Sequence, residues 1–214
     1  MPDTDSSHST PLRLAVLLLA AGQGSRLGSH PKALLKKGGV TLLAHLCNAI
    51  QPFHPVEFIA ITGFHGDAIE QSLLEMDTSL SRSIQLVRNP APDQGQPSSV
   101  RLGIEALQSN FEVLLVALSD QPLVSNADIG QLLNAFVKRR PGTEVLLPMV
   151  KGQRGNPVLF SREAIQKTLA VANLTCRDFM DLNPKQVHIL NTDNESFVCD
   201  VDTPEDMKKY DLFF

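Results

Sequence analysis

The feature that most constrains the fold is an apolar run that leads directly into a glycine-rich loop. Residues 14–21, LAVLLLAA, contain no polar side chain, and glycine occupies three of the next seven positions. Arg26 lies within this loop and Lys32 lies just beyond it. An uninterrupted apolar run is typical of a strand that is covered on both faces, as in a parallel sheet. The sequence therefore predicts a buried strand followed by a glycine-rich loop with two cationic side chains.

Composition limits the size of the protein and the partners that it can have. A chain of 214 residues, 43% hydrophobic and 20% charged, is long enough for the core of one domain. The net charge of -4 leaves no general basic surface, so we expect no nucleic-acid partner and no anionic membrane partner. Cys47, Cys176 and Cys199 are far apart and form no CxxC motif, which is typical of reduced, buried thiols in a cytoplasmic protein.

The first residues are expected to lie outside the domain. Residues 1–11, MPDTDSSHSTP, are predicted to be a disordered tail, and residues 12–214 a single domain. Arg13 and the apolar run after it resemble the start of a secretory signal. The two aspartates of the tail argue against a signal, and the run is much shorter than the ~18 residues of a membrane span. We therefore predict a cytoplasmic protein.

Strand-like and helix-like segments alternate along the rest of the chain. Near-continuous apolar runs predict further strands at residues 56–62, 84–87, 113–119 and 144–150. Apolar residues at helical spacing predict helices over residues 42–53 and 129–137. Ser125 with Asp128, and Thr203 before Pro204, have the pattern of helix starts. This alternation predicts an α/β fold with an open, mainly parallel (mixed), Rossmann-like sheet that carries helices on both faces.

The opening loop matches neither of two common phosphate-binding patterns. It lacks the GK[ST] of a Walker A loop, and its GxGxxxG spacing is one residue too long for the dinucleotide fingerprint. Glycines nevertheless let main-chain N–H groups approach phosphate oxygens, and Arg26 and Lys32 can offset the charge of a polyphosphate. The alternative is that the glycines only turn the chain, although a turn requires neither cation.

Acidic residues follow two later segments, at the strand ends where ligands bind in open α/β sheets. Asp120 follows the apolar run 113–119, and Asp200 and Asp202 flank Val201 in what is expected to be the end of a short strand. Mg²⁺ prefers carboxylate oxygens and is usually held by one or two of them together with substrate phosphates. Alternate residues of a strand share a face, so both later aspartates are candidates for the second ligand. The alternatives are a turn role for Asp120 and helix capping for Asp202.

A phosphate cradle, two cations and two separated carboxylates suit the transfer of a nucleotidyl group. At the α-phosphate of a nucleoside triphosphate, the protein must position the reactants and neutralise charge rather than supply a nucleophile. The chain contains no GxSxG, no HExxH and no Cys/His metal spacing. The residues alone therefore predict a nucleotide-dependent transferase.

Five segments of the chain resemble a known family. The segments LAAGQGSRLGSHPK, DQGQPSSV, LSDQP, RGNPVLF and DVDTPED, in this order and spacing, are similar to the molybdenum cofactor nucleotidyltransferases. The resemblance extends from Leu14 to about Tyr210. It is greatest to the CTP:molybdopterin cytidylyltransferase branch, because the guanylyltransferase branch opens with LAGG rather than LAAG. It implies a nucleotide-diphospho-sugar transferase fold.

The resemblance implies a role for each matching residue. The nucleotide and its phosphates would be held by Ala20, Ala21, Gly22, Gly24, Arg26 and Lys32, with Gln96, Ser98 and Ser99 near the base or ribose. Asp120 with Asp202 or Asp200 would bind Mg²⁺, or alternatively Mn²⁺. Gly155 and Asn156 would face the acceptor, molybdopterin, whose terminal phosphate attacks the α-phosphorus of CTP and expels pyrophosphate. A molybdenum hydroxylase or its maturation chaperone is an implied protein partner.

Two departures from the family pattern and three alternatives remain at this point. Pro97 stands where the family usually has a small or flexible residue, and residues 172–179, ANLTCRDF, lack the expected glycines, which leaves the acceptor open. The chain could instead transfer a nucleotide to an alditol or sugar phosphate, or use GTP with molybdopterin. A third alternative is a non-catalytic, nucleotide-binding maturation factor, against which the retention of Lys32, Asp120 and Asp202 together argues.

Overall fold

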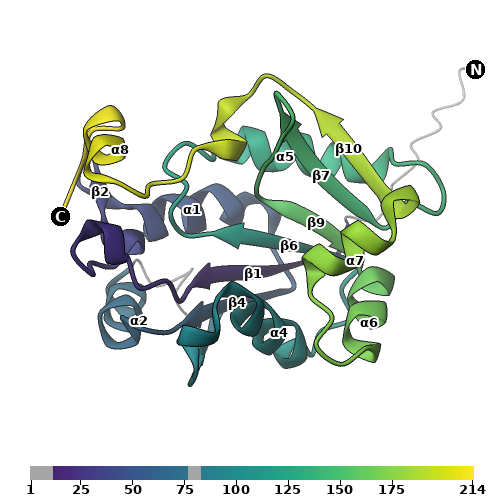
Figure 1. Ribbon diagram of the computed structural model, residues 1–214, viewed down its shortest axis with the longest axis horizontal. Helices are drawn as coiled ribbons and strands as arrows, with labels where there is room; N and C mark the ends of the chain where they lie inside the picture. Colours follow the sequence, from purple (N-terminus) through teal and green to yellow (C-terminus); the bar gives the residue numbers. More distant parts are fainter. Residues whose placement is uncertain (1–11, 77–82) are drawn as a thin grey trace, which may run out of the picture.

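The computed structural model describes residues 12–76 and 83–214, which form a layered α/β structure around one large sheet (Figure 1). The strands of this sheet follow the order β10-β7-β9-β6-β1-β4-β5, and β8 pairs with β7 at one end. Their bounds are Leu14–Ala20 (β1), Glu57–Thr62 (β4), Ile84–Arg88 (β5), Val113–Leu118 (β6), Val145–Val150 (β7), Gln153–Arg154 (β8), Val158–Ser161 (β9) and Val187–Asn191 (β10).

The central strands are parallel, and one antiparallel strand interrupts them. β1 runs parallel to both β4 and β6, whereas β9 lies antiparallel between β6 and β7. β6 and β7 therefore run in the same direction, and the carboxyl ends of β1, β4, β6 and β7 meet at one edge. Since Val158 pairs with Val116, the turn before β9 lies beside the residues that follow β6.

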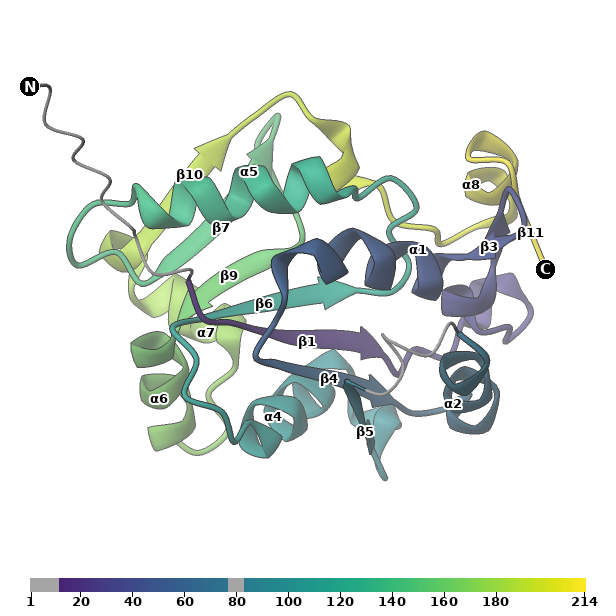
Figure 2. The same ribbon diagram turned by 180° about the vertical axis from the view of Figure 1, so that it is seen from behind.

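Helices cover both faces of the sheet, as Figures 1 and 2 show from opposite sides. α1, α2 and α5 pack on one apolar cluster, and α4, α6 and α7 pack on the other. Their bounds are Leu42–Ile50 (α1), Gly66–Glu75 (α2), Gln96–Ala106 (α4), Asn126–Val137 (α5), Arg162–Ala170 (α6), Cys176–Leu182 (α7) and Pro204–Lys209 (α8). Short 3-10 helices span Ser25–Leu27, Lys32–Leu34, Gln51–Phe53, Pro92–Gln94, Pro184–Gln186 and Glu195–Val198.

A second, small sheet joins the C-terminal segment to residues 36–41, which follow the opening loop. β2 (Lys36–Lys37) pairs antiparallel with β3 (Val40–Thr41) and with β11 (Leu212–Phe213). Next to it, Val201 and Leu212 pack with Leu27, Leu35 and Leu42 in a third apolar cluster. The opening loop is therefore held from both sides, by the main sheet and by the last residues of the chain.

The predicted fold class is confirmed: the sheet is mixed and mainly parallel, with helices on both faces. Every strand predicted from an apolar run is present, and so is the capping box of Ser125 and Asp128. The prediction of a short strand before Asp202 is wrong, because residues 199–203 are irregular and pair with no strand in this structure. β9 and β10 were not predicted from the sequence. The predicted tail lies outside the described residues.

Two further predictions concern the cysteines and the membrane. Cys47, Cys176 and Cys199 are free thiols and all three are buried, as expected. Burial raises the pKa of both Cys47 and Cys176 to about 12, so these thiols stay protonated. In residues 12–76 and 83–214, no helix combines the length and the apolar character that crossing a membrane requires.

Candidate functional site

A cleft of about 470 Å³ opens where β1, β4 and β6 end. This volume lies in the range of small-molecule sites. The opening loop forms one wall, the start of α4 another, and Asp120 and Asp202 lie at the end nearest Lys32. The residues that line the cleft are Leu19, Ala20, Ala21, Gly22, Gln23, Gly24, Ser25, Arg26, Pro31, Lys32, Ala33, Phe64, Ile69, Pro92, Gly95, Gln96, Ser99, Leu118, Ser119, Asp120 and Asp202.

The charged end of the cleft is a cluster of two carboxylates around one lysine. Lys32 Nζ donates to Asp120 Oδ2 at 3.1 Å and also to Asp202 Oδ1. Arg26 Nη1 donates to Asp202 Oδ2 at 3.0 Å. The side chains of Lys32 and Asp120 are 20% and 21% exposed, whereas that of Arg26 is 71% exposed. The two cations and two of the three candidate carboxylates are thus brought together, although 170 residues separate Lys32 from Asp202.

Backbone contacts place the two carboxylates next to each other. Asp120 lies two residues after the end of β6, and its carbonyl oxygen accepts from the N–H of Val201 at 3.1 Å. The next residue, Asp202, has its own N–H bound to Asp206 Oδ2 at 3.0 Å. The capping box of α8 is formed by Thr203 and Asp206. The side chain of Asp202 therefore does not cap the helix and is directed at Lys32 and Arg26.

The charges of this cluster change the protonation of its members. Burial lowers the pKa of Lys32, but the charges and hydrogen bonds of Asp120 and Asp202 outweigh it, so the pKa lies above its ordinary value. Asp200 lies close to the same carboxylates. Partial desolvation and the charges of Asp120 and Asp202 raise the pKa of Asp200 to about 6, while Lys32 and Gln121 oppose the shift. Because Asp200 is exposed as a residue, water screens part of this effect.

The glycines of the opening loop serve two different needs. Gly24 has a φ of +65°, and a Cβ there would lie 1.9 Å from the carbonyl oxygen of His30, so the turn itself requires glycine. A Cβ on Gly22 would meet nothing within 4 Å. The N–H of Gly22 has no acceptor within the described part of the protein. The fold does not require a glycine at position 22, and the space beside it opens into the cleft.

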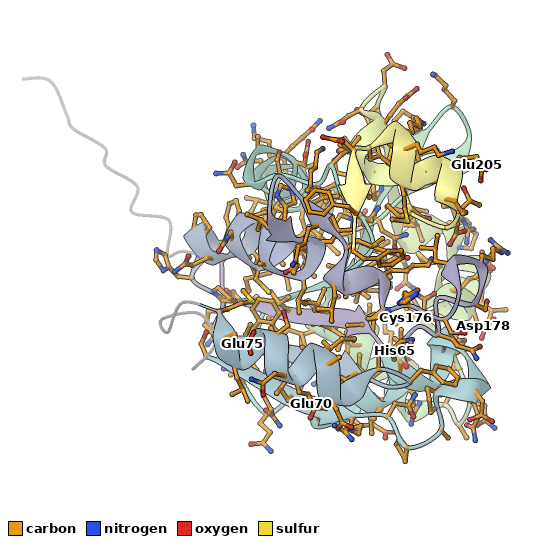
Figure 3. The ribbon with its side chains drawn as sticks, turned by 90° about the vertical axis from the view of Figure 1, so that its left-hand side faces the viewer. His65, Glu70, Glu75, Cys176, Asp178 and Glu205 are labelled. Carbon is orange, nitrogen blue, oxygen red and sulfur yellow. The ribbon has the colours of Figure 1, made fainter. Side chains whose placement is uncertain are left out.

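The uncharged end of the cleft is built by loops that approach one another closely. A Cβ on Gly63 would lie 2.8 Å from Ala21 Cβ and 2.9 Å from Pro92 Cβ. His65 Nε2 lies 2.8 Å from the carbonyl oxygen of Gln23, which ties the start of α2 to the opening loop. Figure 3 views this side of the molecule, with His65 and Glu70 labelled on the α2 side and Glu205 on α8 at the opposite end.

Three residues from the start of α4 were predicted to lie near a base or ribose. Gln96 and Ser99 line the cleft. Ser98 does not, because its hydroxyl donates to the carbonyl of Gly95 at 2.8 Å and accepts from Asn89 Nδ2 at 2.9 Å. Pro97 lies in the first turn of α4, where a proline is well tolerated.

The predicted acceptor residues form a tightly packed turn outside the cleft lining. The N–H of Gly155 donates to the carbonyl of Pro148 at 2.9 Å, and the N–H of Asn156 donates to that of Phe197 at 2.8 Å. A Cβ on Gly155 would lie 2.8 Å from both Phe197 Cβ and the Phe197 carbonyl oxygen. Asn156 precedes a cis peptide bond to Pro157. The turn adjoins the charged end of the cleft through Gln121, whose amide donates to both Asn156 and Phe197.

Sequence reasoning missed several residues at this site. Phe64 follows β4 at the same sheet edge as Asp120, and its ring is the one aromatic ring among the described residues that line the cleft. It is 44% exposed. Ser119 and Pro92 also line the cleft. Applying the strand-end rule to β4 as well as to β1 and β6 would have found Phe64.

The acidic cluster suits a divalent cation whose coordination shell is completed by a substrate. In residues 12–76 and 83–214, no three His, Cys, Asp or Glu side chains are grouped so that they form a metal site by themselves. Asp120 and Asp202 offer hard oxygen atoms on either side of one ammonium group. Mg²⁺ typically takes one or two carboxylates and completes its shell with water and phosphate, so the donor set fits such an ion.

The sequence matches a known family over most of its length. Residues 16–187 match the model of the MobA-like NTP transferase domain. The chain belongs to this family. Membership supports the nucleotidyltransferase class that the sequence predicted, and it decides neither the nucleotide nor the acceptor.

Two relatives of this MobA-like domain differ in name and in how much of their length the chain matches. The Bifunctional protein GlmU of Mycobacterium avium is 31% identical over 149 residues, which are 69% of this chain and 30% of that protein. The chain thus spans less than a third of the length of that relative. The Nicotine blue oxidoreductase of Paenarthrobacter nicotinovorans is 32% identical over 218 residues, 97% of this chain and 98% of that protein.

Solved structures share the fold of the MobA-like domain. Rv0371c from Mycobacterium tuberculosis superposes with a TM-score of 0.73 at 21% identity, over 94% of this chain and 98% of that one. The 4-diphosphocytidyl-2C-methyl-D-erythritol synthase of Anaerococcus prevotii gives 0.71 at 16% identity, over 94% and 95%. At these identities the likeness concerns the fold.

Proposed function

We propose that residues 12–214 act as one domain that transfers CMP from CTP to the terminal phosphate of molybdopterin and releases pyrophosphate. The observation that carries the proposal is the cleft itself. Its charged end joins Lys32 to Asp120 and Asp202, and its glycine wall has room at Gly22 for a ligand. Cations, carboxylates and an approachable backbone are what a metal-bound triphosphate needs.

Each side of the cluster has a distinct task in this proposal. Lys32 and Arg26 bind phosphate oxygens and stabilise charge that develops on the leaving pyrophosphate. Asp120 and Asp202, with Asp200 beside them, hold Mg²⁺ or Mn²⁺, which supplies Lewis-acid charge at the phosphates when bound. A complex of Rv0371c with manganese, at a TM-score of 0.67 and 20% identity over 92% of this chain and 97% of that one, supports the choice of a divalent ion. An oxygen of the acceptor phosphate forms the new bond to the α-phosphorus as the bond to pyrophosphate breaks.

The remaining residues of the cleft orient the nucleotide. Ala20, Ala21, Gly22 and Gly24 border the phosphates and base, and Gln96 and Ser99 face them from the start of α4. Ser98 acts by holding the 89–95 loop through its hydroxyl. The methyl group of Ala21, where the guanylyltransferase branch has glycine, narrows the space beside the base. This narrowing supports a pyrimidine over a purine and hence CTP over GTP.

The acceptor side extends from the cluster toward Gly155 and Asn156. We assign this turn to the molybdopterin side because it adjoins Asp120 through Gln121 and lies outside the nucleotide end of the cleft. A molybdenum hydroxylase, or its maturation chaperone, is then the partner that receives the product. The proposed setting is the cytoplasm, without a nucleic-acid or membrane partner.

The test is pyrophosphate release in the presence of Mg²⁺, measured for CTP and GTP with molybdopterin, an alditol phosphate and a sugar phosphate. The proposal expects turnover with CTP and molybdopterin and at least ~10²-fold lower kcat/KM with GTP. Equal or better use of GTP contradicts the choice of base. Turnover with CTP and only an alditol or sugar phosphate keeps the chemistry and replaces the acceptor. Nucleotide binding without pyrophosphate release from any pair favours the maturation factor.

The near full-length similarity to Nicotine blue oxidoreductase supports a second candidate, an oxidoreductase. The glycine spacing of the opening loop does not match the dinucleotide fingerprint, which favours the transferase. The same protein preparation, given nicotine blue dye and NADH or NADPH as the electron donor, distinguishes the two. Bleaching of the dye that depends on the enzyme, without pyrophosphate release in the first assay, would establish the second candidate.

A further inference from the structure

Gln121, the residue after Asp120, lies buried at the junction of three chain segments. It is 1% exposed. β6 ends just before it, the turn at Gly155 and Asn156 lies on one side, and residues 197–202 lie on another. These segments carry the candidate metal ligands and the candidate acceptor residues, so Gln121 connects both halves of the proposed reaction.

The amide of Gln121 has one orientation that satisfies its neighbours. Nε2 donates to the carbonyl oxygens of Asn156 at 3.3 Å and Phe197 at 3.2 Å. Both partners are acceptors only, as is the carboxylate of Asp200 with which the same amide interacts, so the nitrogen must face them. Oε1 then points away and has no hydrogen-bond partner among the described residues, although it is buried.

A buried amide with an unpaired oxygen costs stability, so packing alone does not explain a glutamine at this position. An apolar side chain of the same shape would avoid the cost of the unpaired group. The hydrogen bonds that Gln121 does make continue into a network: the N–H of Asn156 donates to Phe197 O at 2.8 Å, and the N–H of Val201 donates to Asp120 O at 3.1 Å. Asp120 and the segment that leads to Asp202 are therefore joined twice, once through the backbone and once through this amide.

We propose that Gln121 is a positioning residue that sets the spacing between Asp120, the 197–202 segment and the acceptor turn. By holding Phe197 O and Asn156 O at one nitrogen, it fixes how far Asp202 and Asn156 lie from Asp120. The inference rests on the proposed function, in which Asp120 and Asp202 bind a divalent cation and Asn156 faces the acceptor. It predicts that the loss of this amide weakens metal and acceptor binding together, while the nucleotide wall, which Gln121 does not touch, is unaffected.

The test compares Gln121→Met with Gln186→Met. Gln186 provides a control because its Nε2 also donates within the protein, to Asn183 at 3.4 Å, and its Oε1 is also buried without a partner in the described structure, while it is not among the residues that line the cleft. Mn²⁺ affinity is measured by electron paramagnetic resonance on the whole protein, alongside thermal unfolding. We expect the Mn²⁺ dissociation constant to rise at least five-fold in Gln121→Met and to stay within two-fold in Gln186→Met.

Steady-state kinetics provide the second readout. For Gln121→Met we expect the KM for the acceptor to rise at least five-fold and the KM for CTP to stay within two-fold. A Gln121→Met protein that is less stable but retains wild-type Mn²⁺ affinity and acceptor KM overturns the inference. If Gln121→Met does not fold, Gln121→Asn, one methylene too short for both carbonyls, is expected to show the same loss of affinity.

The two proposals fail in distinguishable ways. Wild-type protein that binds Mn²⁺ in an Asp120-dependent manner but never releases pyrophosphate contradicts the proposed function, and the Mn²⁺ comparison still decides the role of Gln121. Wild-type protein whose Mn²⁺ binding does not depend on Asp120 overturns the positioning role as well.

Discussion

Two glycines, Gly22 in the opening loop and Gly155 in the acceptor turn, differ in how much space the protein leaves for a side chain. A Cβ at Gly22 would meet no protein atom within 4 Å, whereas a Cβ at Gly155 would lie 2.8 Å from Phe197. The fold therefore requires glycine at position 155 and leaves position 22 free. The nucleotide wall of the cleft keeps open space, while the acceptor turn is set by packing and hydrogen bonds. The charged cluster around Lys32 lies between these two regions.

The largest effect is expected at that cluster, where both regions meet. Asp120→Asn removes a carboxylate charge at nearly constant shape, and Lys32→Ala removes the ammonium between the two carboxylates. Each should lower kcat/KM by at least ~10²-fold, because one transition-state charge contact of this kind contributes about 2.7–4 kcal/mol. Pyrophosphate release measures the loss, circular dichroism checks the fold, and Asp181→Asn, at a surface ion pair with Arg154, is the control. Activity that survives Asp120→Asn, or is indifferent to EDTA, would contradict the metal assignment.

Alanine at each of the two glycines tests whether position 22 is kept open for a ligand and position 155 for packing. Gly22→Ala should leave the unfolding temperature unchanged and raise the KM for CTP about ten-fold or more, since the methyl group occupies space that a phosphate needs. Gly155→Ala should destabilise the protein by about 1–3 kcal/mol through overpacking, with the KM for CTP unchanged. Thermal unfolding and initial rates measure both. Gly130→Ala in α5, where a Cβ would make ordinary contact with Phe53 at 3.6 Å, is the clash-free control and should stabilise the protein by up to ~1 kcal/mol.

The exposed position of Arg26 predicts a smaller effect on the nucleotide side. Arg26 is 71% exposed and contacts only Asp202 of the cluster carboxylates in the described structure, whereas Lys32 is 20% exposed and contacts two. Water screens the charge of Arg26, so Arg26→Ala should lower kcat/KM about three- to ten-fold. The decrease in kcat/KM that Arg26→Ala causes should also become smaller at high salt. A decrease as large as that of Lys32→Ala would show that the loop closes over the phosphates and buries Arg26.

The smallest effect concerns pH and Asp200. Its pKa is raised in the folded protein to about 6, so ionisation above pH 6 disfavours folding and protonation below it relieves the penalty. Asp200→Asn should therefore stabilise the protein at pH 7.5 by about 0.5–1 kcal/mol, a reduced figure because the residue is exposed. The advantage should fade as pH falls from 6 toward 4. Thermal unfolding at several pH values measures it, and a pH-independent difference between the two proteins would contradict the shift.

The sequence predicted those parts of the fold that local patterns determine. Long apolar runs such as residues 14–21 and 113–119 gave unambiguous strands, and Ser125 with Asp128 marked a helix start correctly. β9 has only four residues, and its antiparallel place between β6 and β7 depends on long-range pairing. Local patterns contain no information of that kind.

The site was predictable where a residue lies next to a strand end and less so elsewhere. Arg26, Lys32 and Asp120 were found because they follow strands or glycines. Asp202 reaches the cluster through an irregular segment that was predicted as a strand, and only the structure shows that it, rather than Asp200, has a hydrogen bond with Lys32. The role proposed for Gln121 cannot be predicted from the sequence, since its Nε2 donates to two main-chain carbonyl groups, 35 and 76 residues away.

Nucleotidyl transfer is tested by following the position of a phosphorus label. The protein is incubated with Mg²⁺, molybdopterin and CTP labelled with ³²P at either the α- or the γ-phosphate, and the products are separated. Nucleotidyl transfer moves the α-label into the acceptor product, and the γ-label leaves entirely as pyrophosphate. A γ-label in the acceptor or in free phosphate, with the α-label left in CDP, would contradict it.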